Sequence, residues 1–550
     1  MNRRFLSSLI ALALVGVLSL AAFACTSVLV TPGASIDGTA TVTQTADCGT
    51  CAFEIFKVPA QDWAPGTMVE VKFLPQQTSG RSLGEIIRST GNFIPQVPHT
   101  YSYIGGLFGM INEHQVGIGE TTIGARRDFN NSTGFFDITN LSMLALERGA
   151  TAREAIQVMG DLAVKYGYKD SGEELSVSDT KEVWMFEICG PGALWSYGDA
   201  EPGAFWVARR VPDGHISVSA NSSMIDYIDF NDHENFMFGP GIREFAQEMG
   251  WWSPAQGQLN WRVDFNGSVR FEYSYRRVTR IYNKVAPSLA NTFTERTAPF
   301  SIKVDKKLSI QDVIDLSRDH YEGTQYDATT SLTAGPWANP RRYLGWNFAS
   351  GGVNYAWQRV ISSIQCEYYI VTQSRGWLPD AIGGVLWYGP TAPAITTMVP
   401  LYNSVTELSP SLTSEKAGSS LNFQRESFWW SIQYLNTIVD LKWSVIYPVI
   451  QNFQVKYEKD LVKYQNAIDN AAVELYKKSP ALAIEFLTNF CKNNVETVRD
   501  AAWDLFDYIM WTNKAGMVVN LETERVAAGS YPAAWLNMIA PLATGDHYVR

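Results

Sequence analysis

Histidine and the common catalytic motifs of hydrolases are scarce in this sequence. It has six histidines, and none stands in an HExxH motif or in another paired spacing typical of metal ligands. The GxSxG turn of the α/β-hydrolases and the GxxxxGK phosphate-binding loop are both absent. These absences argue against a zinc hydrolase and a P-loop nucleotide hydrolase, and nothing in the sequence calls for a metal ion or a cofactor.

Positive charge is also in short supply. The chain has 44 Lys and Arg residues against 55 Asp and Glu residues, a formal net charge of −11. Such a chain is a poor candidate for binding nucleic acid or an anionic membrane surface. Charged residues make up only 18% of the chain, and it contains 18 Trp, 25 Tyr and 27 Phe. This composition indicates a well-folded globular protein.

Cysteine is too sparse for a disulfide scaffold, with six residues in 550. Cys48 and Cys51 form one CxxC pair, and no second pair exists to complete a zinc ribbon. A local disulfide is the leading interpretation of the pair. Two reduced structural thiols and a redox site are the alternatives.

The N-terminus has the features of a secretory signal peptide. Arg3 and Arg4 precede an apolar stretch from Phe5 to Leu20, and Ala22-Phe23-Ala24 fits the small-x-small cleavage rule. We therefore expect residues 1–24 to be removed and the protein to be secreted or periplasmic. A retained membrane anchor is the alternative, although the stretch is short and no later apolar run could span a bilayer.

Cleavage after Ala24 would place Cys25 at the start of the mature chain. Its α-amine, with an ordinary pKa of about 7.7–8.0, could then act as a general base near pH 7. The thiol is itself a strong nucleophile. One residue would thus supply nucleophile and base, as in N-terminal threonine enzymes, and no histidine would be needed. The alternatives are a structural cysteine and a lipid-modified cysteine, but a lipobox usually has Leu where Ala22 stands.

The order of strand and helix signals predicts an α+β fold. Residues 26–31 and 39–45 read as two strands around Pro-Gly and Asp-Gly turns, which would bring Cys25 close to Asp47. Strands are also expected at 183–188, 204–208 and 215–220 and within 355–402. From about residue 426 apolar residues recur every three or four positions, which predicts helices that pack on the core.

Several stretches resemble the secreted cysteine-type dipeptidases of the dipeptidase A type, a family of N-terminal-nucleophile hydrolases. They lie in order along nearly the whole mature chain. The stretches are "CTSVLVTPGASIDGTATVTQTAD" (25–47), "IPQVPHTYSYIGGLFGMINEHQVGIGETT" (94–122), "ALERGATAREAI" (145–156), "EVWMFEI" (182–188), "VARRVPDGHISVSAN" (207–221), "RDHYEGT" (318–324) and "QSRGWLPDAIGGVLWYG" (373–389).

The resemblance implies a four-layer αββα sandwich and amide hydrolysis through a thioester on Cys25. It implies that Asp47 holds the N-terminal amine and that Asn221 contributes to the oxyanion hole. Thr121 or Thr122 would donate to the oxyanion or the substrate, and Arg270 would lie beside the nucleophile. For Asp47, Asn221, Thr121, Thr122 and Arg270, a purely structural role is the alternative interpretation. The sequence departs from the family at Gln44, where many relatives have an arginine.

We therefore predict a signal peptide at 1–24, a hydrolase domain at 25–415, a helical region at 416–520 and a tail at 521–550. The predicted activity is that of a dipeptidase acting on small peptides, without metal or cofactor, with a homo-oligomer left open. Two alternatives remain: an N-acyl amidase of the penicillin V acylase and bile salt hydrolase kind, and a non-catalytic surface lipoprotein anchored at Cys25.

Overall fold

The structure is a computed structural model that describes residues 25–266, 272–290, 292–294, 297–342 and 347–542. The predicted signal peptide and Arg270 lie outside the described residues.

Two antiparallel sheets form the centre of the molecule, which confirms the predicted α+β class. The strands predicted near residue 25, between residues 183 and 220 and within residues 355–402 are present. The seven-stranded sheet has the order β16 (Ser301–Lys303), β14 (His215–Ser219), β1 (Ser27–Val30), β2 (Thr41–Thr45), β19 (Tyr368–Gln373), β20 (Val385–Pro390), β21 (Val399–Tyr402). The eight-stranded sheet has the order β15 (Phe236–Phe238), β13 (Phe205–Arg210), β12 (Val183–Cys189), β11 (Gly172–Ser178), β10 (Gly117–Thr122), β9 (Gly109–Asn112), β8 (Tyr103–Gly105), β3 (Phe56–Val58).

The two sheets contact each other through their central strands. β1, β2 and β19 of the first sheet lie against β9 to β12 of the second. Every residue of β1, β2, β10 and β11 except Thr122 is buried, because strands covered on both faces have no solvent side. The polar side chains of these strands, Gln44 and Glu120 among them, are therefore buried as well.

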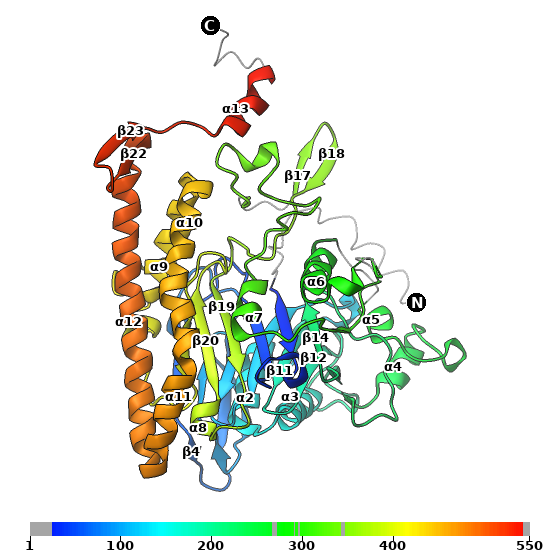
Figure 1. Ribbon diagram of the computed structural model, residues 1–550. Helices are drawn as coiled ribbons and strands as arrows, with labels where there is room; N and C mark the ends of the chain where they lie inside the picture. The colour runs from blue at the N-terminus through cyan, green and yellow to red at the C-terminus, as the bar shows by residue number, and fades with distance from the viewer. Residues whose placement is uncertain (1–24, 267–271, 291, 295–296, 343–346, 543–550) are drawn as a thin grey trace.

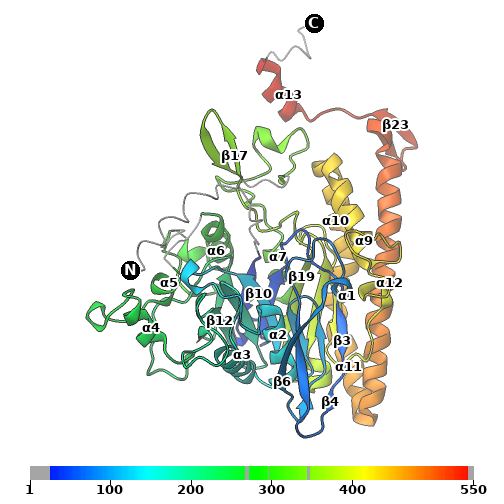
Figure 2. The ribbon, with the colours of Figure 1, turned by 180° about the vertical axis from the view of Figure 1, so that it is seen from behind.

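Helices pack on both sheets (Figure 1). α2 (Ile138–Arg148) and α3 (Ala152–Tyr166) contact strands of the eight-stranded sheet. α9 (Phe428–Ile438) and α12 (Pro480–Thr512) contact β20 and β21 of the other sheet, and α6 (Glu272–Val285) contacts β14. Seen from behind, the same two helical groups flank the sheets (Figure 2).

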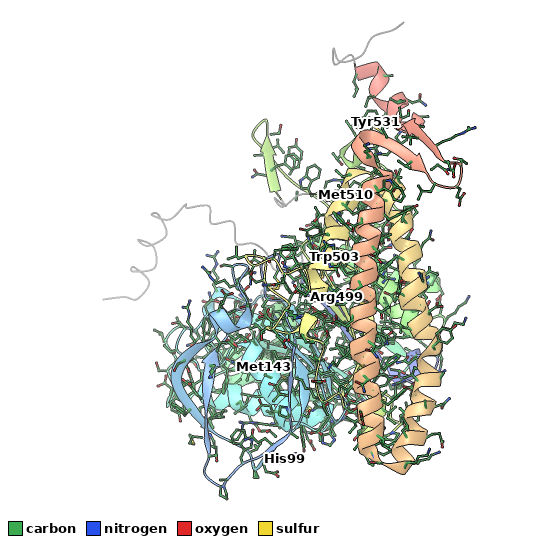
Figure 3. The ribbon with its side chains drawn as sticks, turned by 90° about the vertical axis from the view of Figure 1, so that its left-hand side faces the viewer. His99, Met143, Arg499, Trp503, Met510 and Tyr531 are labelled. Carbon is green, nitrogen blue, oxygen red and sulfur yellow. A yellow bond between two sulfur atoms is a disulfide. The ribbon has the colours of Figure 1, made fainter. Side chains whose placement is uncertain are left out.

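The C-terminal part is helical, as its periodicity predicts. α11 (Asp460–Lys478) and α12 pair along their length, and α12 stands as a long rod on which Arg499, Trp503 and Met510 succeed one another (Figure 3). Buried α12 residues such as Leu487 and Val495 belong to the same apolar core as the sheets. The predicted boundaries at residues 415 and 520 stay a prediction.

None of the helices in the described part of the chain is both long and apolar enough to cross a membrane.

The remaining elements are shorter helices and two-stranded pairs that connect the parts described above. The helices are α1 (Leu83–Ile86), α4 (Ile242–Glu248), α5 (Trp261–Asp264), α7 (Ile310–Leu316), α8 (Asp380–Gly383), α10 (Trp443–Gln454) and α13 (Ala533–Ile539). The two-stranded pairs are β4 (Gln61–Asp62) with β7 (His99–Thr100), β5 (Met68–Phe73) with β6 (Arg88–Pro95), β17 (Asn347–Ser350) with β18 (Val353–Ala356), and β22 (Met517–Asn520) with β23 (Arg525–Ala528).

A buried ion pair attaches the helical region to the sheets. The Arg375 guanidinium donates to both oxygens of Asp469 on α11, with 3.2 Å from Nη2 to Oδ1, and the Tyr402 hydroxyl donates to Oδ1 over 2.6 Å. Both charged side chains are at most 6% exposed. Removing one partner would leave the other charge buried and unpaired.

We expect Asp469→Ala to lower the free energy of unfolding by about 3–5 kcal/mol, the usual cost of breaking a buried pair from one side. Denaturant unfolding followed by tryptophan fluorescence measures this. The control is Glu474→Ala, which removes an exposed pair with Lys477 on the same helix and should leave the midpoint unchanged. Equal effects of the two substitutions would contradict the role given to Asp469.

Candidate active site

Cys25 and Asp47 lie together at one end of the β1–β2 pair, as the sequence predicts. Antiparallel pairing continues to the residue before β1, because Thr26 and Thr45 form a bridge in which the Thr45 amide donates to the Thr26 carbonyl over 3.0 Å. Cys25 precedes this bridge and Asp47 follows it, so both side chains come to the same end of the sheet. Both residues are at most 2% exposed.

The guanidinium of Arg277 on α6 joins the start of β1 to the end of β14. Its Nη1 donates to the Cys25 carbonyl over 2.7 Å and to Oγ1 of Thr26 over 2.8 Å. Its Nη2 donates to the Ala220 carbonyl over 3.0 Å and to Oδ1 of Asn221 over 2.8 Å. Burial, and after it the nearby Arg359, lowers the pKa of Arg277 to about 10, so the group stays positively charged at neutral pH.

The Asp47 carboxyl group is held mainly through Oδ2, with the thiol of Cys366 as a further neighbour. Its Oδ2 accepts from Oγ1 of Thr45 over 3.0 Å and pairs with the Arg359 guanidinium. Its Oδ1 is buried and has no hydrogen-bonding partner in the described part of the chain. Burial raises the pKa of Asp47, while Arg359 and then Arg277 oppose that rise. A buried acceptor without a donor is costly unless a further group completes it.

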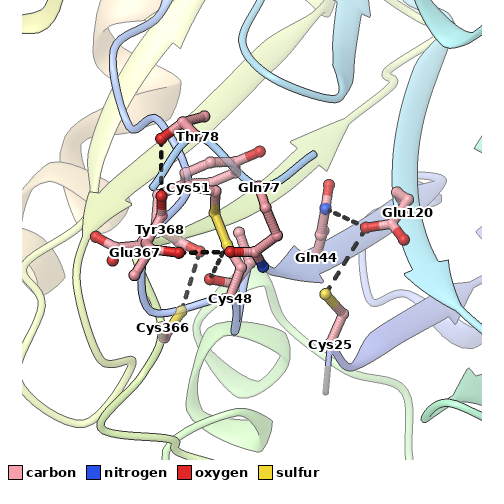
Figure 4. The surroundings of a disulfide bond; sticks show 12 residues. Cys25, Gln44, Cys48, Cys51, Gln77, Thr78, Glu120, Cys366, Glu367 and Tyr368 are labelled. Carbon is pink, nitrogen blue, oxygen red and sulfur yellow. Dashed lines mark hydrogen bonds between the residues drawn. A yellow bond between two sulfur atoms is a disulfide. The ribbon is translucent and has the colours of Figure 1, made fainter. Parts of the chain in front are cut away.

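Glu120 on β10 reaches Cys25 from the other sheet (Figure 4). Its Oε2 lies 3.7 Å from the Cys25 sulfur and accepts from Nε2 of Gln44 over 3.0 Å. The preceding Gly119 permits this approach, because a Cβ there would lie 2.7 Å from the Thr43 carbonyl oxygen. Gly119 therefore serves the close packing of the two sheets.

Burial raises the pKa of the Cys25 thiol well above its ordinary value, and the charges of Glu120 and Asp47 add to that rise. Hydrogen bonding from the Asp47 backbone acts in the opposite direction. In the described chain the thiol is therefore held neutral. Its activation requires a base that accepts its proton.

The other predicted site residues divide into two groups. Asn221, in a left-handed conformation with φ of 60°, is brought into the site, where its Nδ2 donates to the Thr122 carbonyl over 2.8 Å. Thr122 lies beside Glu120, to which its hydroxyl donates over 3.1 Å. The Thr121 hydroxyl is instead buried between the sheets, 2.7 Å from the Ser27 hydroxyl. Arg270 lies outside the described residues.

Sequence reasoning missed Arg277, Arg359 and Glu120. Arg277 left a signal, because it falls on the apolar stripe of α6 with Ser274, Val278 and Ile281, where a charged residue is out of place. Glu120 is an acid inside a strand of small and apolar residues, which is a weaker signal of the same kind. Arg359 lies in an irregular segment and left none.

Cys48 and Cys51 form a disulfide, as the leading interpretation expects. It lies in the loop that follows Asp47 and close to the buried Cys366 (Figure 4). Among the residues that the structure describes, no three His, Cys, Asp or Glu side chains are arranged to hold a metal ion.

The family model for peptidase family C69 matches residues 24–456 of the chain. The chain belongs to peptidase family C69. This peptidase is 26% identical over 471 residues to "Dipeptidase A" of Lactobacillus helveticus, covering 82% of this chain and 90% of that protein. It is 27% identical over 340 residues to a "Probable dipeptidase" of Latilactobacillus sakei, covering 62% of this chain and 63% of that protein, slightly less than two thirds of its length. A "Probable dipeptidase A" of Streptococcus pyogenes is 23% identical over 439 residues, with 76% of this chain and 83% of that protein covered.

We expect Arg277→Lys in this C69 peptidase to lower kcat by about 100-fold, the cost of a misplacement of about 1 Å at a reacting centre. A single ammonium cannot reach acceptors on two strands as the flat guanidinium does. Steady-state kinetics measures the effect, with circular dichroism as a check of folding. Arg280→Lys, one turn along α6 at an ion pair with Asp319, is the control and should leave kcat unchanged. Equal losses of kcat in both variants would show that activity depends on the integrity of α6 and not on the contact of Arg277 with Cys25.

Proposed function

We propose that this C69 peptidase is an exported cysteine-type dipeptidase whose mature chain begins at Cys25. The observation that carries the proposal is the convergence of Arg277 and Asp47 on Cys25, just before the start of β1. The relatives' names, all of which describe dipeptidases or probable dipeptidases, support the substrate class.

The half-satisfied carboxylate of Asp47 supports a free amine at Cys25. Removal of residues 1–24 would create an α-ammonium group next to this carboxylate. Oδ1 of Asp47, which has no partner in the described chain, would then accept one of its protons. The same contact would orient the neutral amine as a base toward its own thiol.

The reaction follows from these positions. The Cys25 sulfur attacks the peptide carbonyl carbon, and its proton passes to the Cys25 α-amine. The amine then protonates the leaving nitrogen as the C–N bond breaks, which leaves a thioester on Cys25 and releases the C-terminal amino acid. Water, deprotonated by the same amine, hydrolyses the thioester and restores the thiol. Asn221, with Thr122 beside it, is our candidate for stabilising the oxyanion.

The arrangement of layers agrees with this mechanism. Two sheets in contact, with α2 and α3 on one and α9 and α12 on the other, support the αββα sandwich that the resemblance to N-terminal-nucleophile hydrolases implies. Export by the leader and a periplasmic or secreted location belong to the same proposal, which leaves the oligomeric state open. The competing assignments are a surface lipoprotein anchored at Cys25 and an N-acyl amidase.

Cys25→Ala should reduce kcat/KM for dipeptides by at least about 10⁴-fold, as removal of a nucleophile does in other covalent peptidases. Hydrolysis is measured by release of free amino acid from a dipeptide panel, with acylated amino acids assayed in parallel. Cys491→Ala, which removes a buried thiol on α12, should leave activity intact. Retained activity in Cys25→Ala would refute the mechanism, and turnover of acyl amides alone would refute the substrate class.

A further inference from the structure

A pair of buried carboxyl groups lies next to the nucleophile and has no part in the mechanism above. Glu120 on β10 and Glu173 on the neighbouring β11 are both at most 1% exposed. In the sheet register Glu173 stands opposite Thr122, two residues beyond Glu120. The two carboxyl groups lie close enough that each affects the pKa of the other.

The pair leads from the nucleophile toward solvent. Nε2 of Gln76 donates to Oε1 of Glu173 and to Oδ2 of Asp170, each over 3.2 Å. Gln76 and Asp170 are partly exposed, whereas Glu173, Glu120 and Cys25 are buried. Polar side chains therefore connect the surface to the Cys25 sulfur.

No cationic side chain in the described part of the chain pairs with these two carboxyl groups. In the described residues neither Glu120 nor Glu173 forms an ion pair with Lys, Arg or His, and no donor reaches Oε2 of Glu173. The nearest lysine in sequence, Lys169, pairs with Asp137. Burial raises the pKa of Glu120 to about 7 and, together with the charge of Glu120, raises that of Glu173 further above its ordinary value. Two carboxyl groups that must share a proton to remain buried form a site that a cation would complete.

The geometry of a dipeptide identifies that cation. In its first residue the α-nitrogen and the carbonyl carbon are both bonded to Cα, so they lie only about 2.5 Å apart. A carbonyl carbon in position for attack lies about 3–3.5 Å from the sulfur. The α-ammonium group must therefore lie close to Cys25, and Oε2 of Glu120 is a carboxylate oxygen 3.7 Å from that sulfur.

We propose that Glu120 and Glu173 bind the free α-ammonium group of the residue whose carbonyl is attacked, and so restrict the enzyme to substrates with an unblocked N-terminus. This inference rests on the proposed dipeptidase function and specifies how a dipeptide is distinguished from an acylated amino acid. Arg277 donates to the Cys25 carbonyl, and Arg359 pairs with Asp47. The site therefore has a positive side with these two arginines and a negative side with Glu120 and Glu173.

The first test uses the unmodified, mature enzyme. We compare kcat/KM for a dipeptide, its N-acetyl derivative and an analogue in which hydrogen replaces the α-amino group. The free dipeptide should be preferred by at least about 100-fold, the usual effect of leaving a buried charge without its partner. Equal turnover of all three substrates would overturn the inference and leave the dipeptidase function standing. Turnover of the N-acetyl derivative alone, with none of the dipeptide, would refute the dipeptidase function itself.

The second test uses Glu173→Gln, which keeps the size of the side chain and removes its charge. We expect kcat/KM for the free dipeptide to fall by about 100-fold, mainly through KM, while the slow turnover of the desamino analogue stays the same. Glu174→Gln is the matched control, because it changes the next buried carboxyl on β11, which accepts from the Ser176 hydroxyl.

Equal losses on both substrates would mean that Glu173 acts in catalysis or folding, and would contradict the inference. Thermal unfolding of both variants monitors folding. If Glu173→Gln does not fold, Glu120→Gln, assayed with the same pair of substrates, must change the preference for the free amine or the inference is wrong.

Discussion

The buried guanidinium of Arg277 is the contact on which the arrangement of the site depends. It is the point where the residues just before β1, the residues just after β14 and the helix α6 meet. In the mature enzyme that we propose, Cys25 has no preceding residue to hold it in place, so contacts to its own carbonyl and to the next side chain would have to fix it. Arg277 supplies both, and it stays charged although it is fully buried.

Around that contact the charges are separated. Arg277 and Arg359 lie with Asp47 at the backbone of Cys25. On the side of its sulfur, Glu120 lies within 3.7 Å, and Glu173 lies next to Glu120 on the neighbouring strand of the other sheet. Gln44 belongs to this division, because it donates to Glu120 where an arginine would neutralise it. Gln44, at the position where the resemblance leads us to expect an arginine, thus brings no counter-charge to Glu120. Our two proposals are linked here: one side receives the enzyme's amine and the other the substrate's amine.

Much of the framework could be predicted from the sequence, because it depends on local signals. The turns after Val30 and Ile36 and the β-branched residues around them predict the β1–β2 pair and the meeting of Cys25 with Asp47. The three- and four-residue spacing after residue 426 predicts α9 to α12. Arg359 and Glu173 could not be predicted as neighbours of the site, since their positions depend on how one sheet packs on the other. The resemblance points to Arg270, which lies outside the described residues, and the structure places Arg277, seven residues later, at the Cys25 carbonyl.

The central claim is that removal of the leader creates the catalytic residue. The most direct measurement is the intact mass and N-terminal sequence of active enzyme exported by a host that processes its leader. The account predicts a free N-terminus reading Cys-Thr-Ser and a mass that corresponds to residues 25–550. A diacylglyceryl mass increment, or active enzyme that begins at another residue, would leave Cys25 without a free amine and would contradict the account.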